Sequence, residues 1–157
     1  MGRDHTRMSL HHASTTTSSV TAPLAADLRR SSARQRVTCG GTADLRLLRI
    51  VDYIDAHLGE CELGEQMICE AFAMSRSTVY RLFQAHGGVA RYIRECRAWL
   101  AHQHLARDPG CRLTWLLYEV GFASERQFQR AFQAQFGMSP ADWRQSCRQR
   151  ARAPRLS

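Results

Sequence analysis

The stretch GFASERQFQRAFQAQFG at residues 121–137 has a partial copy, SRSTVYRLFQAHGG, at residues 75–88. With Ser75 aligned on Ser124, six residue pairs are identical: Ser75/Ser124, Arg81/Arg130, Phe83/Phe132, Gln84/Gln133, Ala85/Ala134 and Gly88/Gly137. In each copy the apolar residues recur at helical spacing, which predicts one buried face, while polar side chains fill the opposite face. The repeat therefore predicts two helices of the same design in one chain.

Each predicted helix follows a short helical segment and a tight break. The break is Gly121-Phe122-Ala123 before Ser124 and Ala73-Met74 before Ser75. A left-handed residue followed by an apolar one commonly ends a helix before such a turn, and Ser124 with Gln127 fits a capping box. This order of helix, turn and capped helix is a helix-turn-helix motif, whose second helix can hydrogen-bond base edges and phosphates in a major groove.

The periodicity elsewhere predicts an all-α, seven-helix protein. Helices are expected at about 42–58, 65–72, 75–86, 89–106, 113–120, 124–136 and 139–149, and no segment after residue 41 alternates like a strand. Thr42 is the expected N-cap of the first helix and Gly59 its stop, while Ser139 caps the last helix. Residues 1–41 contain few large apolar side chains, so they are expected to form a disordered tail.

The chain of 157 residues has a net charge of +8, and all 22 of its basic residues are arginines. This balance favours an anionic partner such as nucleic acid. No apolar run is long enough to span a bilayer and no signal-peptide pattern is present, so we expect no membrane partner and a cytoplasmic location. The six cysteines form no C-x-x-C pair, and His102 and His104 diverge on their helix, so neither a metal site nor a cofactor is expected.

From about Leu47 to Arg144 the chain resembles the DNA-binding region of AraC/XylS-type transcription regulators. The resemblance rests on RIVDYIDAHL at 49–58, MSRSTVYRLFQAHGGVARYIRECR at 74–97 and EVGFASERQFQRAFQAQFGMSPADWR at 119–144. It implies two helix-turn-helix units, at 42–88 and 111–148, joined by a linker helix at 89–106 and followed by a basic tail at 149–157. A helix of that length spans roughly 25 Å, which suits two recognition helices placed about one DNA turn apart.

The resemblance also implies which side chains meet DNA. The expected base-reading residues are Arg76, Ser77, Tyr80, Arg81, Glu125, Arg126, Gln129 and Arg130. The expected phosphate contacts are the cap N–H groups at Ser75 and Ser124, Arg144 and the Arg-rich tail. Arg97 is expected to form a structural ion pair within the linker helix. The implied protein is a transcription activator that binds double-stranded DNA as a monomer in the nucleoid, with RNA polymerase as a further candidate partner.

Five positions depart from the family pattern. Cys69 and Leu117 stand where alanine is usual, and Leu117 is expected to tilt the second unit because over-packing costs about 1–3 kcal/mol. Ala73 stands where glycine is expected, and a left-handed alanine costs on the order of 1 kcal/mol. Trp99 and Leu100 replace polar residues of the linker helix, either as a partner surface or as an incidental exposed pair.

Three functions compete. A sequence-specific transcription regulator is favoured. An enzyme would need chemistry such as the cysteine cluster of the alkyl-transfer DNA-repair module that sometimes accompanies this domain, and only Cys39 lies in the N-terminal region. The third is a truncated remnant of a longer regulator that acts as an interaction module without tight DNA binding, since family members usually carry a sensor domain upstream.

A chain that begins at Thr42 should unfold cooperatively at nearly the melting temperature of the full chain, because residues 1–41 have too little apolar surface to contribute to a core. Thermal unfolding followed by circular dichroism measures this. A loss of several degrees would show that the tail packs on the domain.

Overall fold

The computed structural model describes residues 44–152, so the expected disordered tail and the last five residues lie outside it. Within that range the chain is all-α, as expected, with no strand. Its elements are α2 (Leu45–His57), α3 (Glu65–Phe72), α4 (Arg76–Phe83), the short 3₁₀ helix η2 (Gln84–His86), α5 (Val89–Arg107), α6 (Leu113–Glu119), α7 (Glu125–Phe136) and α8 (Pro140–Arg152).

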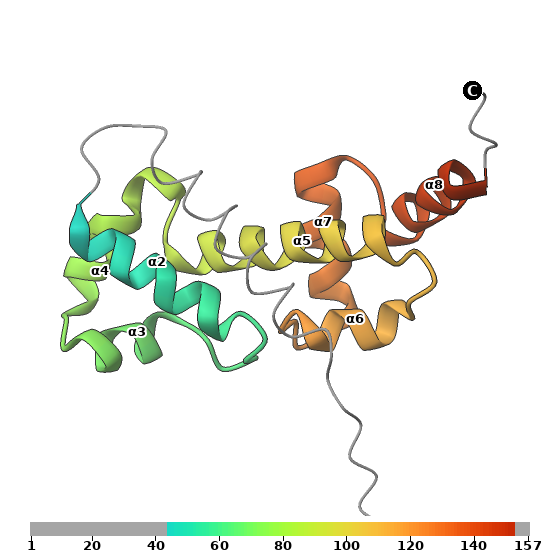
Figure 1. The fold of residues 1–157 in the computed structure, drawn as a ribbon. Coiled ribbons are helices and arrows are strands. Elements are labelled where there is room, and N and C mark those ends of the chain that lie inside the picture. The colour runs from blue at the N-terminus through green and yellow to red at the C-terminus, as the bar shows by residue number, and fades with distance from the viewer. Residues whose placement is uncertain (1–43, 153–157) are drawn as a thin grey trace, which may run out of the picture.

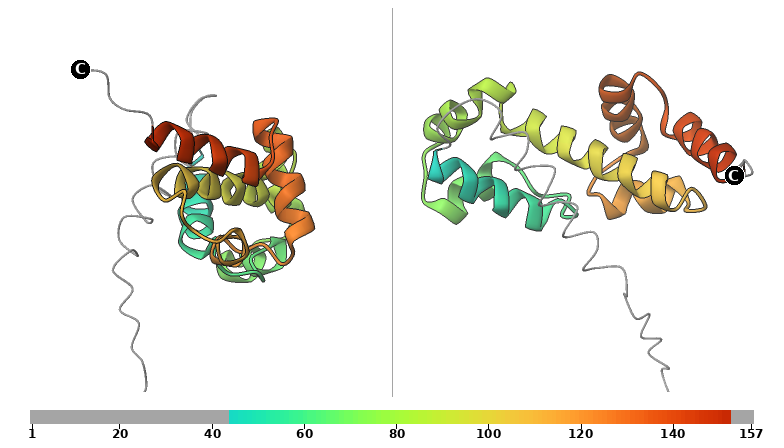
Figure 2. Two further views of the ribbon diagram at one scale, coloured as in Figure 1. Left: turned by 90° about the vertical axis from the view of Figure 1, so that its right-hand side faces the viewer. Right: turned by 45° about the horizontal axis from the view of Figure 1, so that its top comes forward.

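The linker helix α5 connects two groups of helices (Figure 1). The first unit, α2–α4 with η2, lies at the N-terminal end of α5, and the second unit, α6–α8, lies at its C-terminal end. Further views show α7 and α8 against the C-terminal half of α5 (Figure 2). Buried residues of α5, among them Tyr92 and Leu105, belong to a hydrophobic core that extends through both units.

Two expected helix ends differ from the structure. Asp44 rather than Thr42 caps α2, because the Asp44 carboxylate accepts a hydrogen bond of 2.8 Å from the N–H of Arg46. At its other end α2 has Leu58 as C-cap, directly before Gly59, so this helix stops where the sequence predicted. Helix α8 continues to Arg152 instead of ending near residue 149, so part of the predicted basic tail is helical.

The turn before α4 has the predicted left-handed residue. Ala73 has φ 49° and ψ 43°. The N–H of Met74 donates to the carbonyl of Cys69 at 3.0 Å, and the N–H of Ala73 donates to Glu70 at 3.4 Å. These two bonds are the Schellman pattern, which satisfies carbonyls at the end of α3.

The turn before α7 repeats this pattern. Gly121 has φ 87°. The N–H of Phe122 donates to the carbonyl of Leu117 at 2.9 Å, and the N–H of Gly121 donates to Tyr118 at 3.0 Å. The two units therefore share a turn geometry as well as a sequence pattern, although one uses alanine and the other glycine.

Of the positions that depart from the family pattern, Leu117 and Leu100 are buried. Leu117 is buried in the core, and the tilt expected from it stays a prediction. The hypothesis of an exposed pair at 99–100 is wrong for Leu100, which is only 5% exposed and belongs to the core. Trp99 is half-buried. The helical spacing of these residues turns Leu100 toward the packed face of α5.

The prediction that Arg97 forms a structural ion pair within the linker helix is also wrong. The guanidinium is buried and donates from Nε to the carbonyl of Leu58 at 3.0 Å and from Nη2 to that of Glu60 at 2.6 Å. Its partners are main-chain oxygens beyond the end of α2, not a carboxylate of α5. Burial lowers the pKa of Arg97, an effect opposed by Cys61, but arginine keeps its proton in proteins.

The Ala73→Gly variant should raise the free energy of unfolding by a few tenths to about 1 kcal/mol, because glycine adopts the left-handed region without the Cβ penalty. Ala134→Gly is the matched control, since Ala134 is exposed within α7. There the same change should destabilise by roughly 0.5–1 kcal/mol. Chemical denaturation measures both, and destabilisation by Ala73→Gly would refute the backbone argument.

Candidate DNA-binding interface

The first candidate recognition helix is α4. Ser75 caps it, with Oγ accepting from the N–H of Thr78 at 3.3 Å. Val79 and Phe83 are fully buried and attach the helix to the core. The residues predicted to read bases lie on the other side and are all exposed: Arg76, Ser77, Tyr80 and Arg81.

Tyr80 is the most apolar of these side chains, and it is 58% exposed. Ser77 is less free than the sequence suggests, because its hydroxyl lies 3.0 Å from Ser75 Oγ in a hydrogen bond. A hydroxyl can donate one bond and accept others, so Ser77 keeps capacity for a base or a phosphate. The exposed face of α4 thus combines two guanidinium groups, an aromatic phenol and a hydroxyl.

The second candidate recognition helix is α7. Ser124 caps it, with Oγ accepting from the N–H of Gln127 at 3.4 Å, which confirms the serine half of the expected capping box. Phe128 and Phe132 are buried. Opposite them Glu125, Arg126 and Arg130 are exposed, and Gln129 is half-buried.

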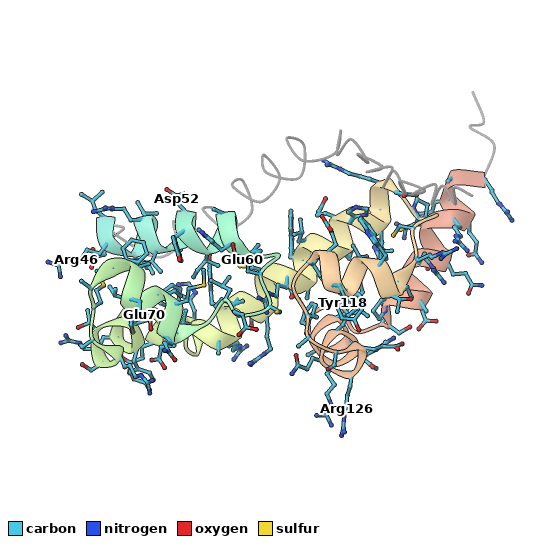
Figure 3. The ribbon with its side chains drawn as sticks, turned by 90° about the horizontal axis from the view of Figure 1, so that it is seen from below. Arg46, Asp52, Glu60, Glu70, Tyr118 and Arg126 are labelled. Carbon is cyan, nitrogen blue, oxygen red and sulfur yellow. The ribbon has the colours of Figure 1, made fainter. Side chains whose placement is uncertain are left out.

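Arg126 extends away from the body of the protein in the view from below (Figure 3). Gln133, one helical turn after Gln129, is exposed as well and was not among the predicted base-reading residues. Its signal in the sequence was its identity with Gln84 in the first copy. The exposed face of α7 therefore extends over about two and a half turns, from Glu125 to Gln133.

A stack of aromatic rings holds α7 and α8 on the linker helix. The His102 ring lies 4.3 Å from that of Phe136 and 4.1 Å from that of Trp143, measured between centroids, with interplanar angles of 21° and 15°. Trp143 also donates from Nε1 to the carbonyl of His102 at 3.1 Å. Burial lowers the pKa of His102. His102 is thus a half-buried packing residue, and its surroundings favour the neutral form of the ring.

Arginines of α8 already have partners within the protein. Arg144 is half-buried and donates from Nη1 to the carbonyl of Cys111 at 3.3 Å, so its predicted phosphate contact would use its other N–H groups. Arg148 donates from Nε to the carbonyl of Pro109 at 2.7 Å. The guanidinium of Arg150 lies over the Trp143 ring, 5.5 Å from its centroid. Arg150 therefore belongs to α8 and contacts Trp143, although the sequence placed it in the basic tail at 149–157.

Other kinds of site find no support in residues 44–152. This range contains no group of three His, Cys, Asp or Glu side chains placed to hold a metal ion. Nor does any helix of the described range have the length and apolarity needed to cross a bilayer. Its five cysteines, Cys61, Cys69, Cys96, Cys111 and Cys147, are free thiols.

The family model of a helix-turn-helix domain matches residues 68–146, half of the chain. This match begins in α3 and ends in α8, so it includes both turns and both capped helices. The chain belongs to the AraC-type helix-turn-helix family. The expected resemblance is thereby confirmed, and the chain is a DNA-binding transcription regulator rather than an enzyme.

Relatives of this AraC-type regulator agree in sequence and fold. Regulatory protein SoxS of Salmonella typhimurium is 26% identical over 97 residues, which cover 60% of this chain and 89% of SoxS. The C-terminal domain of AraT, a response regulator from Geobacillus stearothermophilus, superposes with a TM-score of 0.62 at 20% identity over 68% of this chain and 88% of that domain. A DNA-binding transcriptional dual regulator from Escherichia coli K-12 gives 0.59 at 19% identity, over 70% and 98%.

Lowering the pH should destabilise this regulator through His102. Because its pKa is lowered by folding, the unfolded chain takes up a proton near the ordinary value of about 6.5 while the folded ring stays neutral. The contribution of His102 to stability is therefore complete above about pH 6.5 and declines as the pH falls toward the depressed folded value.

Urea unfolding of the His102→Phe variant at about pH 7.5 and 5.5 measures this, because phenylalanine keeps the ring stack without titrating. The variant should lose less unfolding free energy between these pH values than the wild type. His104→Phe, on the same helix but outside the stack of His102, is the matched control. An equal loss in His102→Phe and the wild type would contradict the assignment.

Proposed function

We propose that the chain binds DNA as a monomer and reads two successive major-groove segments, one with α4 and one with α7. The observation that carries this proposal is the duplication in three dimensions. Two capped helices, each behind a left-handed turn, lie at opposite ends of one 19-residue helix. At 1.5 Å per residue α5 is about 28 Å long, close to the 34–36 Å of one turn of duplex DNA.

Base reading is assigned to the arginines at equivalent positions of the two copies, Arg81 and Arg130. Both are exposed, and each lies two residues before a fully buried Phe that attaches its helix to the core. A guanidinium aimed by a helix in this way matches the O6 and N7 acceptors of guanine. The remaining exposed residues of α4 and α7 complete two different reading faces, so the proposed DNA site is asymmetric.

The excess of arginine supports phosphate contacts around these faces. Each phosphate neutralised by an arginine releases counterions, which makes binding strongly dependent on salt. Activation through RNA polymerase and a cytoplasmic, nucleoid-associated location belong to the same proposal.

Selection of bound sites from random duplex DNA tests the proposal. It should yield one asymmetric site with two preferred segments about 10 base pairs apart, bound by a single chain in sedimentation or light scattering. An obligate palindrome occupied by a dimer would refute the proposal that the chain binds DNA as a monomer. Absence of salt-dependent binding to any duplex would favour the interaction module without tight DNA binding.

Arg130→Ala and Arg81→Ala should each weaken binding to the selected site by about 1–3 kcal/mol and relax the preference at one base position. Arg152→Ala is the control, because Arg152 is exposed in the last turn of α8 and lies outside both reading faces. Its loss should weaken binding to all sequences alike and lower the salt slope by about one unit.

The measurement is the affinity for the selected site and for its point variants over a range of salt. If Arg130→Ala weakens all sequences equally, Arg130 contacts a phosphate and its assigned role is wrong. If only Arg81→Ala has an effect, the first unit alone reads DNA.

A further inference from the structure

The two units meet directly where the end of α2 reaches the turn between α6 and α7. Gly121 approaches the carbonyl oxygen of Leu58 so closely that a Cβ on Gly121 would collide with it. The neighbouring residue of the first unit is also close to the second unit, because a Cβ on Gly59 would lie 3.1 Å from the carbonyl oxygen of Glu119. The main chains of the two units are therefore in direct contact here, because neither glycine has a side chain that would hold them apart.

Arg97 occupies the same junction from α5. It is 7% exposed and bonds the carbonyls of Leu58 and Glu60, and a Cβ on Gly121 would also lie 2.9 Å from its Nε. Glu60 lies beyond the end of α2 on the side of the second unit (Figure 3). One guanidinium thus contacts the first unit through hydrogen bonds and the second unit through the close approach of Gly121.

This contact resists relative rotation of the units. Turning the second unit about α5 in one direction would press Gly121 against the Leu58 carbonyl and Arg97. Moving the first unit away would leave a buried guanidinium without its partners, which is strongly destabilising. A packed junction of this kind has one favourable arrangement rather than a continuous range.

The junction also lies next to the second reading helix. Gly121 is the left-handed residue of the turn that leads into α7, and Leu58 directly follows α2 of the first unit. The position of the first unit is thereby transmitted through Leu58, Arg97 and Gly121 to the start of α7.

We propose that Arg97 and Gly121 form a spacing lock, which holds α4 and α7 in one relative position and makes the regulator selective for one separation of its two DNA segments. Arg97 is a positioning residue that touches no DNA. This inference rests on the proposed reading of two segments. Each base pair inserted between them displaces one segment by about 3.4 Å and rotates it by about 34°, so a rigid protein rejects the altered site.

The experiment measures the affinity of the full chain for a series of duplexes in which the two selected segments are separated by the preferred spacer or by one or two base pairs more or fewer. The wild type should prefer one spacer by roughly tenfold or more, the effect of about 1.4 kcal/mol. Arg97→Met, which keeps an unbranched side chain but loses both bonds, should reduce this preference to about threefold or less. Arg97→Lys, which can donate to one carbonyl, should retain an intermediate preference.

Arg94→Met is the matched control, since Arg94 is exposed on the same helix. It removes the same charge, so any general loss of affinity appears in both variants, whereas the spacer preference should survive in Arg94→Met alone.

A second pair of variants tests the junction without altering a charge. Gly121→Ala and Gly137→Ala both place alanine at a positive φ, 87° and 73°, so both incur the same kind of left-handed backbone penalty. Nothing lies within 4 Å of a Cβ on Gly137, whereas one on Gly121 meets Leu58 and Arg97. Gly121→Ala should shift or flatten the spacer preference, and Gly137→Ala should preserve it.

Unchanged spacer preference in cooperatively folded Arg97→Met and Gly121→Ala proteins overturns the spacing lock. If Arg97→Met does not fold, Arg97→Lys and Gly121→Ala decide by the same measurement. A wild type that reads two segments with no spacer preference refutes the lock and leaves the proposed function standing. A wild type that binds no two-segment site refutes both.

Discussion

The guanidinium of Arg97 is buried among main-chain oxygens, and this placement constrains three parts of the chain at once. A buried cation must be hydrogen-bonded, so the segment after α2 must present the carbonyls of Leu58 and Glu60 to α5. Gly121 must come close to the same group, so a side chain at that position would force the junction to shift. The linker helix consequently does more than connect two units, because one of its side chains is part of the contact between them.

This constraint explains why the two copies of the repeat differ at their turns. Both turns need a left-handed residue with the same pair of hydrogen bonds. Ala73 is exposed, so alanine there incurs only the backbone penalty of on the order of 1 kcal/mol. Gly121 is buried against Leu58 and Arg97, where a Cβ would collide with the main-chain oxygen of Leu58 and force a shift. The neighbours of position 121 therefore call for glycine in the second copy. At position 73 of the first copy, glycine would only remove the backbone penalty.

The two faces proposed to read DNA also differ from each other in their side chains. Helix α4 exposes Arg76, Tyr80 and Arg81, while α7 exposes Glu125, Arg126 and Arg130. Two different faces held by one chain suit an asymmetric site, for which the orientation of the protein on DNA is defined. A regulator that acts on one side of its site benefits from such a defined orientation.

The sequence by itself determined the helices, their caps at Ser75 and Ser124, the left-handed turn at Ala73 and the buried faces of α4 and α7. These features depend on residues within one or two helical turns of each other, so their signals are local. The cap of α2 was misassigned by two residues, because Asp44 and Thr42 are both suitable caps and only the bonded geometry distinguishes them.

Tertiary structure alone decided the partners of Arg97, the burial of Leu100 and the stacking of His102 between Phe136 and Trp143. The oxygens that bind Arg97 lie 39 and 37 residues earlier in the chain and belong to the backbone. A main-chain carbonyl has no residue type that could identify it in a sequence, and so a charged side chain such as Arg97 is predicted to pair with a nearby carboxylate. Only the packing of α5 against both units shows that backbone oxygens, rather than a carboxylate, bind the guanidinium of Arg97.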